Sequence, residues 1–248
     1  MEVIKSADNR TVKHISKLKD KKYRDEYGEF FAEGYKNVLD TVAARPELVK
    51  TVVLSESAYG EFGEKFCDFN TTVIADNVFD KITDTKTCQG VLCVMQKPKS
   101  AMPKADCCIL LDRVRDPGNV GTILRTAVAC GYDVVANNCA DVYSPKVIRS
   151  AMSAAVKCNI GTDISVDDIK RMGYVVIVAD MHGDNVFTAE HSGKYCIVVG
   201  NEAEGVSEEI KNKADKLLAL PQSNMESLNA AVAAAVMMFV LRYGQNNL

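Results

Sequence analysis

The 248-residue chain lacks several features that mark common classes of protein. Its N-terminus is charged and contains no apolar core of a secretory signal, which predicts a cytoplasmic protein. Its longest apolar run, residues 230–241, is shorter than the roughly 20 residues that a membrane-spanning helix needs. We therefore interpret that run as a buried helix.

The sequence also lacks an obvious metal site or nucleophile. No Cys-x-x-Cys pair occurs among its nine cysteines, and the adjacent Cys107 and Cys108 suit neither zinc nor an ordinary disulfide. Most cysteines lie among Val, Ile, Leu and Ala, as small core residues do, which predicts reduced thiols. The histidines, His14, His182 and His191, form no catalytic or ligand set. We therefore expect no metal, and the pattern disfavours a small-molecule α/β enzyme that depends on such a set.

The net charge of −3 does not by itself predict a nucleic-acid partner. The distribution of charge is more informative, because residues 1–24 carry eight lysines and arginines against three acidic residues. A basic segment attracts phosphate locally, although a solvated helix face can have the same composition. The segment alone leaves both interpretations open.

A stretch rich in proline and lysine, residues 97–104, is the best candidate for a linker. It predicts a first domain at 1–97, a linker at 98–105 and a second domain at 106–248, both domains being of ordinary size. In the first domain the pattern predicts helices at 12–22, 35–44 and 56–66 and short strands at 30–32, 49–54, 72–74 and 91–95.

The second domain alternates short apolar strands with helices, which predicts an α/β domain with a parallel sheet covered on both faces. We expect strands at 108–111, 134–136, 174–179, 195–199 and 217–220, and helices at 120–129, 145–156, 166–172, 207–212 and 226–243. Ligands of such sheets bind beyond the carboxyl ends of the strands. The loops after Leu111, Val199 and Leu220 are therefore the predicted site.

In the first of these loops, residues 117–119, Pro-Gly-Asn, turn the strand into a helix. Gly121 and Arg125 then follow four residues apart on one helical face, and the glycine leaves room for a bulky group beside the arginine. An ordinary turn before an amphipathic helix with an exposed arginine is the alternative interpretation.

The second loop, residues 200–205, reads Gly-Asn-Glu-Ala-Glu-Gly and places two carboxylates between two glycines. It contains neither the Gly-Lys-Ser/Thr of a P-loop nor the Gly-x-Gly-x-x-Gly of a dinucleotide site. Because carboxylates repel phosphate, the loop favours a cationic or polar cofactor over ATP or NAD. An acidic helix N-terminus would explain the pattern equally well.

The third loop, residues 220–229, reads Leu-Pro-Gln-Ser-Asn-Met-Glu-Ser-Leu-Asn and leads into an alanine-rich helix. Ser223 or Asn224 could cap this helix, and the alanines allow close packing against a neighbour. A capped and buried C-terminal helix would account for the pattern without any ligand.

Together and in this order, the three loops resemble the signature motifs of the SpoU (TrmH-like) family of RNA 2′-O-ribose methyltransferases, within the SPOUT superfamily. The resembling positions are Asn119-x-Gly121-x-x-x-Arg125-Thr126, Gly200-x-Glu202-x-x-Gly205, and Leu220-Pro221 with Ser227-Leu228-Asn229. The resemblance covers residues 106–243. Residues 1–97 are less specifically similar to the ribosomal-protein-like α/β RNA-binding domain that often precedes it, at Asn9, Lys13, Phe31, Glu33 and Gly34.

The resemblance implies a C-terminal parallel-sheet domain with a deep trefoil knot, a homodimer whose sites borrow residues from the partner, and S-adenosylmethionine (AdoMet) as the methyl donor. The residues implied in cofactor binding are Gly200, Leu220, Leu228 and Asn229. The residues implied in catalysis are Arg125, Asn119, Ser227 and Glu202. Because a guanidinium hardly ever deprotonates, we expect Arg125 to bind a phosphate beside the target ribose. The two-domain layout favours ribosomal RNA as the substrate.

Some positions depart from the family pattern. Gln222 and Asn224 stand where Met and Gly are usual, and Ala151 and Ser153 stand where Ser and Gly are usual. These departures motivate one alternative, a non-catalytic RNA-binding relative that has lost cofactor binding. A second alternative is a SPOUT enzyme that methylates a base, although the first motif favours ribose.

Overall fold

The computed structural model describes residues 2–85, 87–224 and 227–244, and the chain divides into two compact units. Unit 1 comprises Met1–Lys99 and Tyr143–Lys157, and unit 2 comprises Ser100–Val142 and Cys158–Leu248. Tyr143–Lys157 thus lies in the second predicted domain by sequence but in unit 1 by its contacts. The predicted domain ranges, 1–97 and 106–248, stay predictions.

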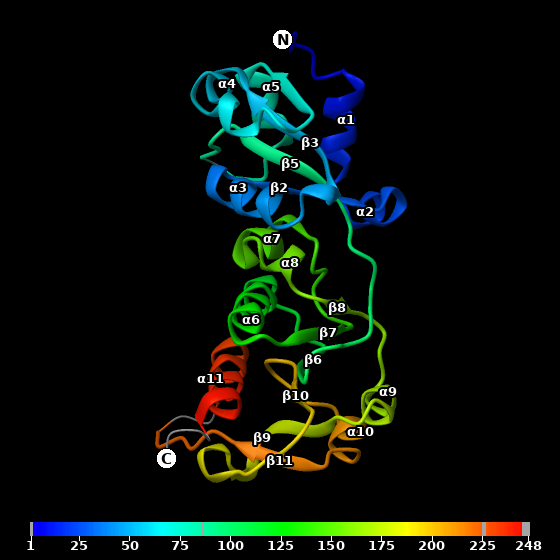
Figure 1. Ribbon diagram of the computed structural model, residues 1–248, viewed down its shortest axis with the longest axis vertical. Helices are drawn as coiled ribbons and strands as arrows, with labels where there is room; N and C mark the ends of the chain where they lie inside the picture. Colours follow the sequence, from blue (N-terminus) through cyan, green and yellow to red (C-terminus); the bar gives the residue numbers. More distant parts are fainter. Residues whose placement is uncertain (1, 86, 225–226, 245–248) are drawn as a thin grey trace. The chain divides into compact units, whose positions relative to one another are not determined.

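Unit 1 is built on a mixed five-stranded sheet (Figure 1). Its strands are β1 (Val3–Ile4), β2 (Glu29–Glu33), β3 (Val49–Ser55), β4 (Thr71–Ile74) and β5 (Val91–Gln96). Their order is β1-β4-β3-β5-β2, in which β5 runs antiparallel to both of its neighbours and the other pairs are parallel. Its helices are α1 (Arg10–Lys17), α2 (Lys21–Tyr27), α3 (Tyr35–Ala44), α4 (Glu56–Phe62), α5 (Asp76–Ile82), α7 (Pro145–Ala151) and α8 (Ala154–Lys157).

Two predicted helices are each interrupted. The helix predicted at 12–22 is wrong as one element, because α1 ends at Lys17 and the side chain of Asp20 caps a new helix, α2, by accepting from the N–H of Lys22. The helix predicted at 145–156 is broken at Met152, whose φ of 55° lies outside the helical region. Short polar side chains and a local backbone turn therefore override the hydrophobic periodicity.

Unit 2 contains a six-stranded sheet in which every neighbouring pair is parallel, as predicted. Its strands are β6 (Cys107–Asp112), β7 (Asp133–Asn137), β8 (Ile160–Gly161), β9 (Val175–Asn185), β10 (Tyr195–Val199) and β11 (Lys216–Ala219). Their order is β11-β9-β10-β6-β7-β8. Its helices are α6 (Pro117–Cys130), α9 (Val166–Arg171), α10 (Glu208–Lys211) and α11 (Ala230–Tyr243).

Helices cover both faces of the sheet of unit 2. Figure 1 draws α6 and α11 on one side and α9 and α10 on the other. On the α9 side, Val166 and Ile169 pack with alternate strand residues such as Leu110 and Val198 in one buried cluster. On the opposite side α11 packs against α6 and β10. This accounts for the continuous apolar strands of the sequence, because both of their faces are buried.

The apolar run at 230–241 lies in α11, as predicted, but its cap differs. The side chain of Asn229 accepts from the N–H groups of Ala231 and Val232, so the prediction of a cap at Ser223 or Asn224 is wrong. The helix was predicted to begin at Glu226, which lies outside the described residues. Among the helices that the structure describes, none combines the length and apolarity needed to cross a membrane.

All nine cysteines are free thiols, and those that are buried are Cys93, Cys107, Cys108, Cys130, Cys158 and Cys196. Burial raises the pKa of Cys93, and likewise that of Cys158, to about 12. These thiols stay protonated at neutral pH and pack as small apolar residues.

Candidate active site

The three predicted loops follow strands that lie close together in the sheet of unit 2. β6 pairs directly with β10, and β9 lies between β10 and β11. Because neighbouring parallel strands end at the same edge of a sheet, the loops after β6, β10 and β11 gather at that edge. The topology therefore brings together segments that are about a hundred residues apart in the sequence.

Asn119 connects the three loops through its side chain. Its amide nitrogen donates to Oε1 of Glu202 at 2.8 Å, and its oxygen accepts from Nδ2 of Asn229 at 2.9 Å. Asn119 is fixed in the first turn of α6, where its N–H donates to the N-cap residue Asp116 at 2.8 Å. One predicted residue from each motif thus belongs to a single hydrogen-bonded chain.

Glu202 is held in its charged form by the groups around it. Partial desolvation of its carboxylate acts to raise its pKa. Hydrogen bonds from the amide of Asn119 and from the N–H groups of Arg115 and Asp116 outweigh this effect and hold the pKa below its ordinary value. Glu202 is therefore a fixed acceptor that joins loops and is poorly suited to collect a proton at neutral pH.

The loop after β10 is a tight closed turn. Asn201 and Gly205 exchange two backbone hydrogen bonds, at 3.1 and 2.9 Å. A Cβ at Gly200 would lie 2.1 Å from the carbonyl carbon of Gly205, and Gly205 itself has a φ of +70°. Both glycines of the second motif are therefore required by the backbone of the loop itself.

Arg113, which the sequence analysis did not single out, joins the loop after β6 to the loop after β10. Its guanidinium donates to Glu204 at 2.5 Å, and its carbonyl oxygen accepts from Nδ2 of Asn201 at 3.0 Å. Hydrogen bonds to Asp112 and Glu204 raise the pKa of Arg113, so the clamp is charged throughout the neutral range. The two loops are thus joined at two points.

A cavity of about 430 Å³ lies at this edge of the sheet. The predicted residues that line it are Gly200, Glu202, Leu220, Ser227 and Leu228. Apolar residues from the strands and from α11 line it as well, namely Val199, Leu218, Ala230, Ala233 and Met237. Gln222, one of the departures from the family pattern, is also part of its wall. A cavity of several hundred Å³ that combines an apolar wall with polar groups is typical of a small-molecule site.

One side of the cavity was missed by the sequence analysis. It is formed by residues 179–182, which follow the apolar half of β9, and by Lys211 at the end of α10. The carboxylate of Asp180, which is 9% exposed, pairs with Lys211 at 2.8 Å and accepts from the N–H of His182 at 2.9 Å. Burial acts to raise the pKa of Asp180, but these two contacts outweigh it and lower the pKa. The available signal was a polar residue directly after an apolar strand, and it becomes informative once β9 is known to lie beside β10.

The charges around the cavity favour a cationic ligand. Carboxylates of Asp180, Glu202 and Glu204 line it; Lys211 pairs with Asp180 and Arg113 with Glu204, so among the described lining residues Glu202 is the carboxylate that no cation neutralises. A positively charged group would therefore be attracted, and a polyphosphate would be repelled. The arrangement can hold and orient a small, partly apolar cation.

Arg125, by contrast, is exposed on α6 and does not line the cavity. It follows Asn119 by six residues, which is a rise of about 9 Å and a rotation of about 240° around the helix. Within the part of the chain that the structure describes, its guanidinium makes no hydrogen bond or ion pair. Within a single copy of the protein, Asn119, Glu202 and Asn229 therefore lie together, whereas Arg125 lies apart from them.

Comparison with known proteins gives matches over both halves of the chain. Residues 106–239 match the model of the SpoU rRNA Methylase family, and residues 9–93 match that of the MRM3-like substrate binding domain. The chain is 32% identical to the 23S rRNA (guanosine(2553)-2′-O)-methyltransferase RlmP of Bacillus subtilis, across 98% of this chain and 100% of the relative.

Solved structures agree with this match. The AdoMet-bound rRNA methyltransferase from Sinorhizobium meliloti is 28% identical, with a TM-score of 0.85 over 100% of this chain and 98% of that one. The SpoU methyltransferase AviRb from Streptomyces viridochromogenes, in complex with AdoMet, has a TM-score of 0.84 over 96% of this chain and 99% of that one. At 22% identity, AviRb shows the likeness of the fold alone.

Proposed function

The chain belongs to the SpoU rRNA methylase family and is an AdoMet-dependent rRNA 2′-O-methyltransferase, and we propose that the cavity beside Gly200 is its AdoMet site. The observation that carries the proposal is the hydrogen-bonded chain from Glu202 through Asn119 to Asn229. It ties all three motif loops together at the edge of the sheet where the cavity lies.

The residues present fit AdoMet. Its adenine and methionine carbon chain suit the apolar wall formed by Leu218, Ala233 and Met237. Its sulfonium is a cation, which matches the excess of carboxylates around the cavity. Gly200, Leu220 and Leu228 would hold it mainly through backbone groups, and Asn229 would act through the position of α11.

When bound, AdoMet supplies an already activated methyl group, so the protein has to orient the 2′-hydroxyl and help remove its proton. Ser227 lies in the cavity wall and is exposed, so its hydroxyl is available to orient the ribose. Asn119 and Glu202 act as positioning residues, because their side chains bond to one another and that of Asn119 also accepts from Asn229. Arg125 keeps its proton and binds a phosphate beside the target ribose.

We propose that Arg125 reaches the cavity of a second copy of the chain in a homodimer. Its distance along α6 from the Asn119 network supports this arrangement. The exposed apolar residues of α11 support it as well, since Val232, Phe239 and Tyr243 are each about half exposed and lie on one helical stripe. A second copy covering this stripe would bury it.

Mixing two inactive variants tests the arrangement in trans. Arg125→Ala and a cofactor-site variant, Ala233→Leu, should each lose most activity alone, while a mixture allowed to exchange subunits should regain up to about a quarter of the wild-type rate by random pairing. A mixture that stays inactive although mass analysis shows heterodimers would place Arg125 in the site of its own chain.

The fold supports the remaining proposals. β11 lies at the edge of the sheet beyond β9, and the chain then returns to pack α11 against α6 and β10, a return that supports the proposal of a trefoil knot. Residues 1–97 are the RNA-binding domain, 98–105 the linker and 106–248 the methyltransferase domain, as the two family matches suggest.

The buried free thiols support a location in the cytoplasm, because thiols stay reduced there.

Calorimetric titration with AdoMet tests the assignment of the cavity. The wild type should bind it saturably, and Ala233→Leu, which adds bulk to the cavity wall, should lose binding. Ala43→Leu adds the same bulk to an exposed position of α3 and should bind like the wild type. Equal binding by both variants would place the cofactor elsewhere, and no binding by the wild type even with RNA present would favour a non-catalytic relative.

A further inference from the structure

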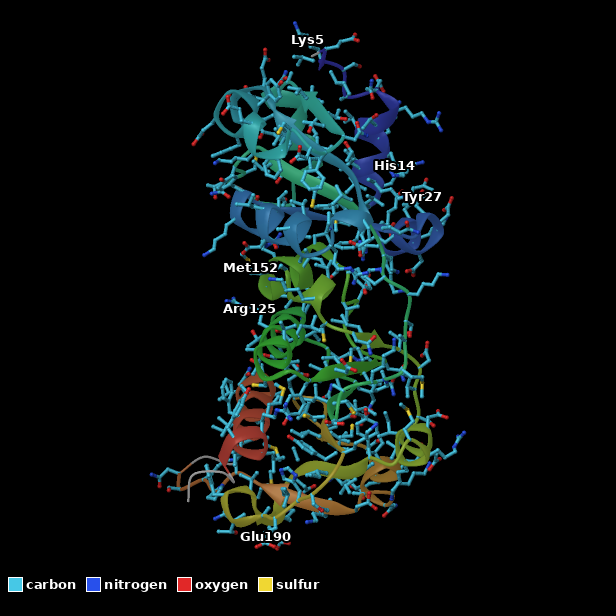
Figure 2. The ribbon with its side chains drawn as sticks, viewed as in Figure 1. Lys5, His14, Tyr27, Arg125, Met152 and Glu190 are labelled. Carbon is cyan, nitrogen blue, oxygen red and sulfur yellow. The ribbon has the colours of Figure 1, made fainter. Side chains whose placement is uncertain are left out.

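Three aromatic rings form a row on the surface of α1 and α2 in unit 1. The ring of His14 stacks on that of Tyr27, with 4.8 Å between centroids and 27° between planes. Tyr27 is followed by Tyr23, at 5.9 Å and again 27°. Figure 2 labels His14 on α1 and Tyr27 on α2 next to each other. The row therefore spans two helices, and its two tyrosines lie beyond the end of the helix that the sequence predicted at 12–22.

The connection between the helices holds the row in place. The guanidinium of buried Arg24 donates to the carbonyl oxygens of Leu18 and Lys19, both at 2.8 Å, which fixes the turn from α1 to α2. Nε2 of His14 bonds to the carboxylate of Glu29 at 2.7 Å, which sets the orientation of its ring. The rings are thus placed by a rigid scaffold before any partner binds.

The three rings differ in what they do for the fold. Tyr27 packs against the core cluster that contains Val12 and Ile15. Tyr23 is partly exposed and is not among the residues that pack on that cluster. Tyr23 therefore forms the outer end of the row, and its position there is not explained by core packing.

Two lysines accompany Tyr23. The Nζ atoms of Lys17 and Lys22 lie 5.1 and 5.5 Å from the centroid of its ring. Neither is paired with a carboxylate among the described residues, whereas the nearby Lys13 pairs with Asp8. The row thus combines aromatic faces with positive charge that no acidic side chain neutralises.

We propose that this row is a stacking platform for an unpaired base of the RNA substrate, with Lys17 and Lys22 turning to the flanking phosphates. Single-stranded RNA is the partner that fits, because its bases expose aromatic faces and its backbone carries one negative charge per nucleotide. A duplex would offer phosphates but no free base face. The proposal rests on the assignment of RNA as the substrate. It adds that unit 1 recognises an unpaired base of that RNA.

Tyr23→Trp gives a direct reporter, because the sequence contains no tryptophan. The fluorescence of this tryptophan should be quenched when unlabelled oligouridine binds. The affinity of Tyr23→Trp for oligouridine should match that of the wild type. Tyr23→Leu should bind oligouridine about tenfold more weakly, since stacking on an aromatic ring is lost. Tyr59→Leu makes the same change at an exposed tyrosine of α4 and should leave binding unchanged.

The salt dependence of oligouridine affinity distinguishes the contribution of the aromatic rings from that of the lysines. Lys17→Gln and Lys22→Gln should each reduce the slope of log affinity against log salt concentration by about 0.7, while Tyr23→Leu should leave the slope unchanged. A matched RNA duplex should bind Tyr23→Leu and the wild type equally. Loss of duplex binding in Tyr23→Leu would overturn the proposal, and so would an unquenched tryptophan in Tyr23→Trp together with full oligouridine affinity in Tyr23→Leu.

Methylation assays distinguish failure of the stacking platform from failure of the methyltransferase assignment. Tyr23→Leu should bind AdoMet normally and methylate saturating RNA at the wild-type kcat, with a raised KM for RNA. If the wild type binds oligouridine through the row but makes no methylated product, the platform stands and the methyltransferase assignment fails. If product forms and Tyr23→Leu has an unchanged KM, the platform fails alone.

Discussion

The side-chain amide of Asn119 donates a hydrogen bond of 2.8 Å to the carboxylate of Glu202, and so joins the beginning of α6 to the loop after β10. The same side chain accepts from Asn229 at the beginning of α11. Asn119, Glu202 and Asn229 thus hold the three motif loops together, in addition to any contact they make with AdoMet.

Asn229 has two functions that substitution can separate. Asn229→Ala should lose about 1 kcal/mol of stability, because the N-cap of α11 is removed, together with the bond to Asn119. Asn229→Ser keeps a capping oxygen but is too short to reach Asn119, so thermal unfolding should return to near the wild type. Loss of the bond to Asn119 should lower the AdoMet affinity of both variants. If serine restores both, the bond to Asn119 has no role in the site.

Gly200 should not tolerate even a methyl group. Its Cβ would meet the backbone of Gly205, so Gly200→Ala should cost about 1 to 3 kcal/mol in the free energy of unfolding and should weaken AdoMet binding. Gly60→Ala is the matched control, because nothing lies within 4 Å of its Cβ position on α4, and it should be stabilising by about 0.5 to 1 kcal/mol. Equal urea midpoints for the two variants would contradict the observed closure of the loop.

Glu202 should contribute to stability in a pH-dependent way. Its pKa in the folded chain lies below the ordinary value of 4.5, so its stabilising contribution is present above that value and is lost as the pH falls through the folded pKa. The difference in unfolding free energy between the wild type and Glu202→Gln should therefore be constant from pH 5 to 8, by this linkage to a pKa near or below about 4.5. It should shrink in more acidic buffer. A difference that grows on acidification would mean that the folded pKa is raised.

In unit 1, buried Glu33 anchors the segment that contains α7. One of its oxygens pairs with Arg149 at 2.8 Å, and the other accepts from the hydroxyl of Thr83 and the N–H of Asp84 at 2.8 and 2.9 Å. A double-mutant cycle of Glu33→Gln and Arg149→Met should give a coupling energy of about 1 to 2 kcal/mol in urea unfolding. Additive effects would show that Arg149 does not hold α7 in unit 1.

The sequence was sufficient to predict most of what local patterns determine. Each strand of the parallel sheet except the short β8 was predicted, because apolar runs bounded by turn residues survive burial on both faces. Gly200 and Glu202 were identified through the family pattern, yet their physical roles were not. Those roles depend on Gly205 and Asn119, whose approach is set by the tertiary fold.

Two parts of the site could not be predicted from local patterns. Asp180 and Lys211 meet only because β9 lies next to β10, and their separation in the sequence gives no sign of it. Arg125 fits the first motif, but helical geometry turns it away from Asn119. A subunit contact, which a single chain does not encode in its periodicity, is the arrangement that we propose for it.

The most direct measurement is nucleoside analysis of rRNA treated with the enzyme. Unmodified rRNA transcripts would be incubated with AdoMet labelled in its methyl group, digested to nucleosides and analysed by mass spectrometry. The account predicts that the label appears in a 2′-O-methylated nucleoside and is lost in Arg125→Ala. Label in a base-methylated nucleoside, or equal 2′-O-methylation by Arg125→Ala, would contradict it.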